Sequence, residues 1–260
     1  MAETLLPALA KGLATDNWDN LYAGLETEIS KIFANSLLDE NGNVISERTK
    51  IFVPDRDLKL KANTIKILPD SQLYGYNTDV YGFVEAIPEE IRAQIENSEI
   101  AVLGNGGAAR AVGVGISILK AKKIDFYVRN IINAAEMVEA LRENFPNVQM
   151  NCKQIEGIKD LSQYKMLVNT TPIGMRSKAM GLSPIDEDVV KTMNKDSVVY
   201  DIVYNPLNTE LIKYAKKHGI KTIQGLDMLI YQGAKAFEIW TGKKPDVLKM
   251  KIAALEAMVD

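Results

Sequence analysis

The chain has 260 residues, of which 47% are hydrophobic and 25% are charged, proportions typical of a globular protein with a sizeable buried core. Its net charge of -3 argues against nucleic acid as a partner, because binding phosphates requires a basic face. No apolar run approaches the roughly 20 residues of a membrane span and the N-terminus has no signal-peptide pattern, so we expect a cytoplasmic enzyme or binding protein.

The first 80 residues predict a small α+β region. Two helices are expected within residues 1–35, because apolar residues recur there at helical spacing. Ile51-Phe52-Val53 is typical of a short strand that ends at Pro54. Residues 63–68 and 72–76 alternate as strands do and flank Pro69-Asp70-Ser71, so they predict a hairpin.

Beyond this region, strand and helix patterns alternate along the chain. A helix from Thr78 is interrupted at Pro88, since proline lacks the amide that a helix interior needs. Strands are then expected at 100–103, 124–128, 148–152, 166–169, 198–202 and 221–223, with helices between them. This alternation predicts an α/β fold with a Rossmann-type, doubly wound parallel sheet. A last helix is expected from Gly233 to about Met258.

A glycine-rich turn follows the strand at residues 100–103 and opens a helix. Gly104 permits the tight turn, Gly106 lets the backbone approach a pyrophosphate, and Ala109 takes the third position, where the helix packs on the strand. The first amides of the helix would point at the phosphates. The stretch therefore predicts a dinucleotide-binding site.

The end of the next strand indicates which dinucleotide is bound. Folds of this type that select NAD place an acidic residue there for the ribose 2′-hydroxyl. Here the strand ends in Val128-Arg129-Asn130, with an arginine and no acid. Because a guanidinium suits a 2′-phosphate, NADP is expected; the alternative is that Arg129 only faces solvent.

Cysteine and histidine are too scarce for several kinds of site. Cys152 is the only cysteine and His218 the only histidine. A disulfide within the chain, a cysteine-rich zinc site, a histidine metal cluster and a Ser-His-Asp triad are therefore not expected. His218 is interpreted as a residue at a helix C-terminus.

Five segments carry recognisable motifs in a fixed order. Residues 75–83 read G-x-N-T-D-x-x-G-F, residues 102–112 form the glycine-rich turn, residues 169–175 read N-T-T-P-x-G-M, residues 201–209 read D-x-x-Y-x-P-x-x-T, and residues 225–234 read G-x-x-M-L-x-x-Q-G-A. Over about residues 61–258 the chain thus resembles the shikimate dehydrogenase family. The resemblance implies a substrate-binding domain at 1–80, completed by the C-terminal helix at 233–260, and an NADP-binding domain at 81–232. It also implies a place in aromatic amino acid biosynthesis.

The resemblance assigns Asp79 to a proton-handling pair beside the reacting carbinol. This role suits the chemistry, because a ketone that is reduced by hydride needs a proton at its oxygen. The resemblance also places Asn63, Tyr204 and Gln232 on the substrate. As alternatives, Thr78 or Asp79 only caps the following helix, Asn63 and Gln232 are turn and helix-start residues, and Tyr204 is buried packing.

Several further residues are implied to contact the cofactor. Gly225 and Met228 would border the nicotinamide, because a glycine permits close approach and a methionine packs on the ring. Asn169 and Thr170 end a strand, where α/β sheets bind their ligands. The predicted cofactor residues are Gly104, Asn105, Gly106, Gly107, Ala108, Arg129, Asn169, Thr170, Gly225 and Met228.

The chain departs from the family before Asp79. The family pattern opens with S-x-S and carries N-V-T-x-P-x-K, whose lysine pairs with the aspartate of N-T-D; neither motif is intact here. Alignment on Pro54 puts Arg56 where the lysine belongs, and arginine can hold an anion but cannot shuttle a proton. Lys50 or Lys61 is therefore expected to be the catalytic partner of Asp79.

Three hypotheses follow from these features. The first is an NADP-dependent dehydrogenase, a monomer or homodimer, that acts on a small molecule and interconverts 3-dehydroshikimate and shikimate. The second keeps the cofactor but changes the substrate to another hydroxy acid or cyclic compound, because the two substrate-side motifs are altered. The third is a catalytically inactive NADP-binding protein.

Overall fold

The computed structural model of the chain describes residues 62–67, 73–177 and 179–258. The helices expected within residues 1–35 and the strand expected at Ile51-Phe52-Val53 lie outside the described residues, as do Lys50 and Lys61. In the part of the chain that is described, no helix is both long and apolar enough to cross a membrane.

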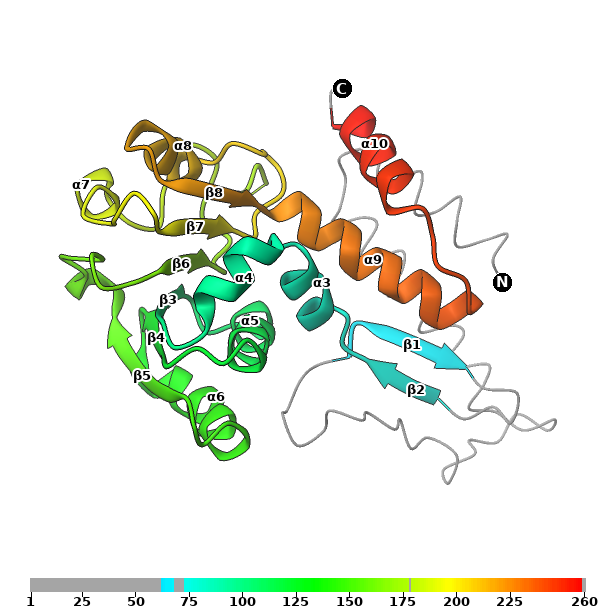
Figure 1. Cartoon of the computed structure of the whole chain (residues 1–260), viewed down its shortest axis with the longest axis horizontal. Coiled ribbons are helices and arrows are strands. Elements are labelled where there is room, and N and C mark those ends of the chain that lie inside the picture. Colours follow the sequence, from blue (N-terminus) through cyan, green and yellow to red (C-terminus); the bar gives the residue numbers. More distant parts are fainter. Residues whose placement is uncertain (1–61, 68–72, 178, 259–260) are drawn as a thin grey trace.

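Six parallel strands form the main sheet, in the order β5-β4-β3-β6-β7-β8 (Figure 1). The strands are β3 (Glu99–Leu103), β4 (Lys123–Val128), β5 (Gln149–Gln154), β6 (Met166–Asn169), β7 (Val198–Asp201) and β8 (Lys221–Gln224). Leu103, Asn169, Asp201 and Gln224 end four adjacent strands and are partners in the register. The loops that follow them therefore start side by side, at the edge where α/β sheets bind ligands. The predicted Rossmann-type sheet is confirmed.

Helices cover both faces of this sheet and produce two apolar cores. One face carries α3 (Asp79–Glu85), α4 (Glu89–Ile95), α5 (Gly107–Ile118) and α6 (Ile131–Asn144), and the other carries α7 (Glu187–Val190) and α8 (Glu210–Lys217). In β3, Ile100 and Val102 enter the first core, whereas Ala101 and Leu103 enter the second. A strand that is buried on both faces reads as a continuous apolar run, which explains why this strand could be found in the sequence.

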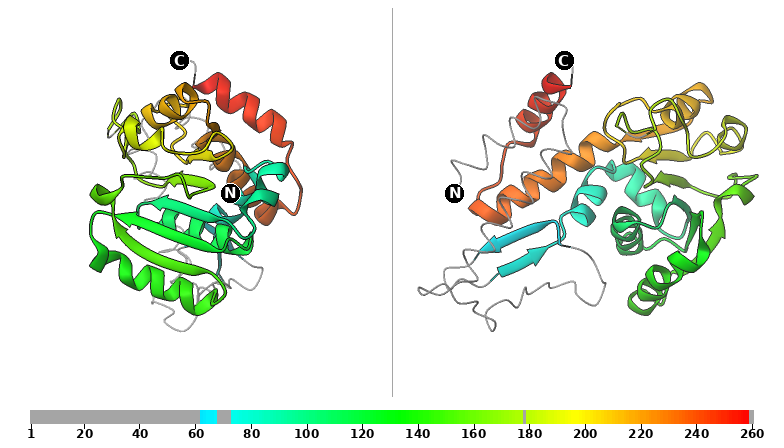
Figure 2. Two further views of the ribbon diagram at one scale, coloured as in Figure 1. Left: turned by 60° about the vertical axis from the view of Figure 1, so that its left-hand side comes forward. Right: turned by 180° about the vertical axis from the view of Figure 1, so that it is seen from behind.

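A separate hairpin lies away from the sheet, beside the far half of the helix α9 (Gly225–Thr241), as Figures 1 and 2 show. Its strands are β1 (Thr64–Ile67) and β2 (Leu73–Tyr76), which pair antiparallel. The indole Nε1 of Trp240 donates a hydrogen bond of 2.9 Å to the carbonyl oxygen of Ile65. The predicted hairpin is confirmed, and α9 links it to the sheet.

The C-terminal helix differs from its prediction. Instead of one helix from Gly233 to about Met258, the chain forms α9, which already begins at Gly225, and a separate α10 (Val247–Ala257). Gly242 ends α9 in the left-handed conformation, with φ of 72°, which glycine adopts without strain. Asp246 then caps α10 by accepting from the amide of Lys249. The prediction of a single helix was wrong because apolar residues continue at helical spacing across this break.

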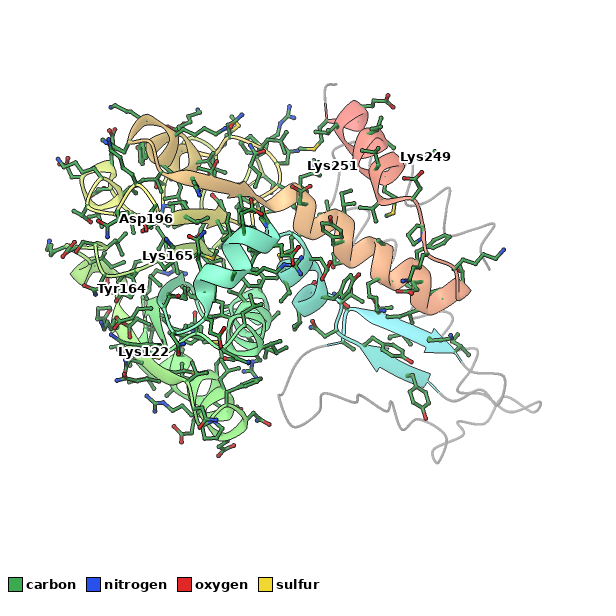
Figure 3. The ribbon with its side chains drawn as sticks, viewed as in Figure 1. Lys122, Tyr164, Lys165, Asp196, Lys249 and Lys251 are labelled. Atoms are coloured by element: carbon green, nitrogen blue, oxygen red, sulfur yellow. The ribbon has the colours of Figure 1, made fainter. Side chains whose placement is uncertain are left out.

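The two helices are tied together at the start of α9. Lys251 of α10, labelled in Figure 3, forms an ion pair of 2.5 Å with Asp227 in the first turn of α9. An acidic residue is favourable in that first turn because the helix dipole is positive there.

Residue 232, the boundary expected between the two domains, falls inside the continuous helix α9.

Candidate active site

Three of the predicted substrate-side residues meet in one cluster, although they come from three different elements. The side-chain Nδ2 of Asn63, just before β1, donates to Asp79 Oδ1 at 2.8 Å and to Gln232 Oε1 at 3.3 Å. Asp79 begins α3 and Gln232 lies inside α9. The hairpin, α3 and α9 thus deliver a carboxylate and two carboxamides to one place, a set suited to hydroxyl and carbonyl groups.

The side chain that caps α3 comes from Asn77, so the carboxylate of Asp79 does not serve as the helix cap. The side chain of Asn77 caps α3, because its Oδ1 accepts from the amides of Asp79 and Val80 at 3.1 and 3.2 Å. Thr78 donates its amide and its hydroxyl to Asn63 Oδ1, at 2.9 and 3.2 Å. The alternative that Thr78 or Asp79 only caps the helix is therefore wrong, and the N-T-D motif orients both Asn63 and Asp79.

Gly82, one turn after Asp79, allows α3 to lie directly against α9. A Cβ at this position would stand 2.6 Å from the carbonyl oxygen of Met228 and 2.9 Å from the Cβ and amide of Gln232, closer than side-chain atoms normally approach. A glycine is thus required here for Asp79 and Gln232 to share one site. Asn77 and Gly82 belong to the first motif, but no separate sequence signal predicted the capping role of Asn77 or the packing role of Gly82.

Burial shapes the electrostatics of Asp79. Removal of the carboxylate from solvent raises its pKa above the ordinary value, and the hydrogen bond from Asn63 partly offsets this rise. Among residues 62–67, 73–177 and 179–258, no cationic side chain contributes to this shift. A carboxyl group with a raised pKa holds a proton more readily near neutral pH, which suits a group that exchanges protons with a substrate.

The glycine-rich turn has the geometry that a pyrophosphate needs. Gly104 adopts a φ of 109°, and a Cβ there would stand 2.7 Å from the hydroxyl of Thr170. Around Gly106 and Gly107, in contrast, a Cβ would meet nothing within 4 Å. Gly106 precedes α5, and neither a capping side chain nor an acidic residue occupies the first turn of this helix. The amides at the start of α5 are thus open to an anion, and the site fits a dinucleotide.

Arg129 directly follows β4, the strand that pairs with β3, and is exposed. The following Asn130 caps α6 by accepting from the amide of Asn133 at 3.2 Å. An exposed guanidinium next to a helix start can receive a phosphate. Asn105 is also exposed at the glycine turn, and Ala108 is half-buried.

The residues at the end of β6 divide into two roles. Thr170 donates its amide and its hydroxyl to the carbonyl oxygen of Leu103, at 3.0 and 2.5 Å, and so ties its loop to the glycine turn. Asn169, in contrast, is completely buried, and its amide donates to Asp201 Oδ1 at 2.9 Å. In this arrangement the Asn169 side chain faces the interior and holds the loop.

Two of the remaining predicted residues, Gly225 and Met228, lie in the first turn of α9. Gly225 lies against the carbonyl group of Ile202 so closely that a Cβ would overlap with it. Met228 is buried, whereas Tyr204 is half-buried.

His218 is the C-terminal cap of α8, as predicted, and its ring Nε2 lies 2.8 Å from Glu187 Oε1.

The chain matches one family model and several curated proteins. Residues 225–255 match the model of the shikimate 5'-dehydrogenase C-terminal domain. A shikimate dehydrogenase (NADP(+)) of Methanocaldococcus jannaschii is 40% identical over 210 residues, which cover 78% of this chain and 70% of that protein. The enzyme of the same name from Methanococcus vannielii is 38% identical over 73% of this chain. The match spans 65% of the Methanococcus vannielii protein, slightly less than two thirds of its length.

Solved structures show the same architecture. A shikimate dehydrogenase in complex with NADP+ is 35% identical, with a TM-score of 0.69 over 80% of this chain and 71% of that chain. Quinate dehydrogenase from Corynebacterium glutamicum, in complex with NAD, is 28% identical, with a TM-score of 0.71 over 78% and 71%. A 5-ketofructose reductase of Gluconobacter is 27% identical, with a TM-score of 0.69 over 79% and 72%.

Proposed function

The chain belongs to the shikimate dehydrogenase family, and from this premise we propose that it is an NADP-dependent oxidoreductase that interconverts 3-dehydroshikimate and shikimate. One observation carries the proposal: Asn63, Asp79 and Gln232, which three separate elements supply, converge in a single hydrogen-bonded cluster. The enzyme would act on a CH–OH group of a small molecule, in keeping with the NADP-dependent relatives.

The residues present suit NADP as the cofactor. The open space around Gly106 and Gly107 and the uncapped start of α5 would accept the pyrophosphate. Arg129 would pair with the 2′-phosphate, and Thr170, Gly225 and Met228 would border the nicotinamide end. NADPH supplies the hydride when it is bound, and the protein supplies binding, orientation and a proton.

On the substrate side, each member of the cluster has a separate task. The amides of Asn63 and Gln232 can donate to or accept from ring hydroxyl groups and so orient the reacting carbon. Asp79 would handle the proton at the substrate oxygen, a role that its burial and raised pKa favour. Tyr204 would line the same side. We further propose that Lys50 or Lys61 is the basic partner of Asp79.

A second candidate function is favoured by the altered motifs before Asp79. The chain lacks S-x-S and has Arg56 where alignment on Pro54 expects lysine. Solved relatives with similar folds include a quinate dehydrogenase and a 5-ketofructose reductase. The same hydride chemistry on a different hydroxy acid or cyclic ketone is therefore the alternative.

The two candidates are separated by one substrate panel. NADPH oxidation is followed with 3-dehydroshikimate, 3-dehydroquinate and 5-ketofructose at several pH values. We expect the highest kcat/KM with 3-dehydroshikimate. Faster turnover of another ketone would replace the first candidate with the second. No turnover of any ketone, together with tight NADP binding, would favour a catalytically inactive binding protein.

We also propose a cytoplasmic enzyme and a domain division at about residues 80 and 232, with the C-terminal helices completing the substrate domain. The hydrogen bond from Trp240 to Ile65 supports this division, because it joins α9 to the hairpin. A monomer or a homodimer is expected in solution, which sedimentation analysis would distinguish.

A further inference from the structure

A buried carboxylate, which the proposed mechanism does not use, lies at the edge of the sheet where the cofactor would bind. Asp201 ends β7 and has no exposed surface. Its Oδ1 accepts from Asn169 Nδ2 at 2.9 Å and from the amide of Val203 at 3.0 Å, and its Oδ2 accepts from the hydroxyl of Thr209 at 2.6 Å. These three partners belong to two of the sequence motifs, at residues 169–175 and 201–209.

Each of these three donors belongs to a different segment of the chain. Asn169 is the last residue of β6, and its Oδ1 accepts from the amide and the hydroxyl of Thr171 at 3.0 and 2.7 Å. Val203 lies in the loop that leaves β7. Thr209 is the cap of α8, where its hydroxyl oxygen accepts from the amide of Ile212. One carboxylate therefore connects the loop after β6, the loop after β7 and the start of α8.

The same loops frame the proposed cofactor site. The loop after β6 is bonded to the glycine turn through Thr170 and the carbonyl oxygen of Leu103. The loop after β7 supports the start of α9, because Gly225 rests on Ile202. A shift of either loop would therefore move residues that border the proposed cofactor site.

We propose that Asp201 is a positioning residue, which fixes the loop after β6 (169–173) and the loop after β7 (202–205) where they meet the nicotinamide end of the cofactor. This inference rests on the proposed function. A buried charge contributes little net stability compared with apolar packing. The role of Asp201 is therefore to fix one arrangement of these loops, as a supporting hydrogen-bond network does for the residues of an active site.

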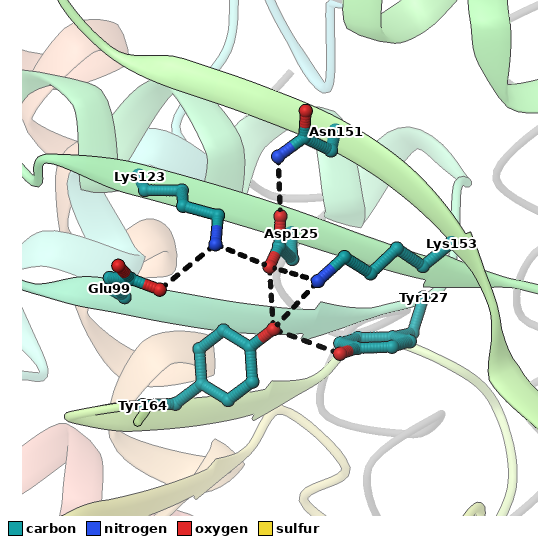
Figure 4. A network of polar contacts seen from close by, with 7 residues as sticks. All are labelled: Glu99, Lys123, Asp125, Tyr127, Asn151, Lys153 and Tyr164. Carbon is teal, nitrogen blue, oxygen red and sulfur yellow. Dashed lines mark hydrogen bonds and ion pairs between the residues drawn. The ribbon is translucent and has the colours of Figure 1, made fainter. Parts of the chain in front are cut away.

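Asp125 offers a matched comparison on the same face of the sheet. It is also completely buried, and it accepts from Lys153 at 2.8 Å, Asn151 at 2.8 Å and Tyr164 at 2.5 Å (Figure 4). This network joins β4 and β5 to Tyr164, which precedes β6 and lies toward the end of the sheet opposite the hairpin (Figure 3). Its removal tests the loss of a buried carboxylate whose hydrogen-bond partners lie outside the loops after β6 and β7.

The experiment compares four variants: Asp201→Asn, Thr209→Val, Thr209→Ser and Asp125→Asn. For each, the melting temperature, the Kd of NADP+ by calorimetry, and kcat and KM with NADPH are measured at a temperature where all are folded. A misplacement of about 1 Å can cost about 100-fold in rate. We therefore expect Asp201→Asn and Thr209→Val to lower kcat/KM for NADPH by about 10- to 100-fold. Thr209→Ser keeps the hydroxyl and should stay within about threefold of wild type.

The expected control result is that Asp125→Asn lowers the melting temperature but leaves kcat, KM and the Kd of NADP+ within about twofold of wild type. Equal losses in Asp201→Asn and Asp125→Asn would overturn the positioning role, as would a failure of Thr209→Ser to restore what Thr209→Val loses. If the wild-type protein binds NADP+ but does not reduce 3-dehydroshikimate, the proposed reaction fails. In that case a Kd of NADP+ that rises in Asp201→Asn and Thr209→Val, but not in Thr209→Ser or Asp125→Asn, still supports the positioning role of Asp201. Unchanged Kd values in all four variants would overturn it.

Discussion

The side-chain amide of Asn63 donates a hydrogen bond of 2.8 Å to the carboxylate of Asp79, although the two residues are 16 positions apart in the sequence. The pairing of β1 with β2 brings them together, and the backbone amide of Asn63 extends this pairing by donating to the carbonyl oxygen of Tyr76 at 3.0 Å. The second bond of the Asn63 side chain, to Gln232, adds α9 to this pair. The substrate-side site is therefore an assembly of the hairpin, α3 and α9.

The Asp79→Asn substitution tests whether this site is catalytic. Asparagine keeps the size of the side chain but cannot exchange a proton, so kcat should fall by about 100- to 10,000-fold. The Kd of NADP+ should stay unchanged, since the proposed role of Asp79 is at the substrate rather than at the cofactor. Steady-state kinetics and calorimetry measure the two effects. An unchanged kcat would mean that Asp79 takes no part in catalysis. Binding of NADP+ by the wild-type protein without any turnover would indicate a catalytically inactive binding protein.

Gly82→Ala tests the contact between α3 and α9. The added methyl group would stand 2.6 Å from the carbonyl oxygen of Met228 and 2.9 Å from Gln232, so the helices must separate. Overpacking of this kind costs about 1–3 kcal/mol. We expect a lower free energy of unfolding in urea and a higher KM for the ketone substrate.

The matched control for this substitution is Gly157→Ala. A Cβ at residue 157 meets nothing within 4 Å, so stability and KM should both stay close to wild type. If Gly82→Ala is as mild as Gly157→Ala, then close contact between α3 and α9 is not required for the site.

Arg129→Gln tests the choice of cofactor. A hydrogen bond to a charged group contributes about 1.5–3 kcal/mol, so the Kd of NADP+ should rise by about 10- to 100-fold. The Kd of NAD+, which lacks the 2′-phosphate, should barely change. Lys122→Gln is the control, because this exposed lysine precedes the same strand at its other end (Figure 3). Equal weakening of both cofactors by Arg129→Gln would contradict the assignment.

The pH dependence of stability provides a test of the Asp201 environment. Burial raises the pKa of Asp201 to about 6, even though three hydrogen bonds oppose the rise. Since the folded-state pKa exceeds the unfolded value, the stability that this group contributes is full below about pH 4 and is lost as the pH rises through about 6.

The free energy of unfolding of wild type minus that of Asp201→Asn should therefore decrease between pH 4 and pH 7, by up to about 3 kcal/mol. Urea unfolding across this range measures the difference, in which the titration of other groups cancels. A difference that increases with pH would mean that the hydrogen bonds hold the pKa of Asp201 below its ordinary value.

The sequence predicted much of the sheet, because strands buried on both faces are apolar runs between turn residues. It could not show where α9 ends, since Trp240 and Leu248 continue the apolar spacing across Gly242 and Pro245. Here the local stop signals of glycine and proline outweighed the periodicity.

The candidate site shows a similar division. Asn63, Asp79 and Gln232 were predicted through the resemblance, yet their mutual contact depends on a hairpin, a cap and the packing at Gly82. Motifs do not reveal which members face a ligand and which face the interior. Asn169 was expected at the cofactor but is buried against Asp201, and no role was predicted for Asp201 itself.

We propose that this protein transfers a hydride between NADP and a ring ketone at the Asn63–Asp79–Gln232 cluster. The most direct test incubates wild type and Asp79→Asn with 3-dehydroshikimate and NADPH that carries deuterium at the transferred position, followed by mass spectrometry and NMR of the product. We predict shikimate with one deuterium at the carbinol carbon from wild type, and almost none from Asp79→Asn in the same time. Absence of deuterated product from wild type, or equal rates from both proteins, would contradict the account.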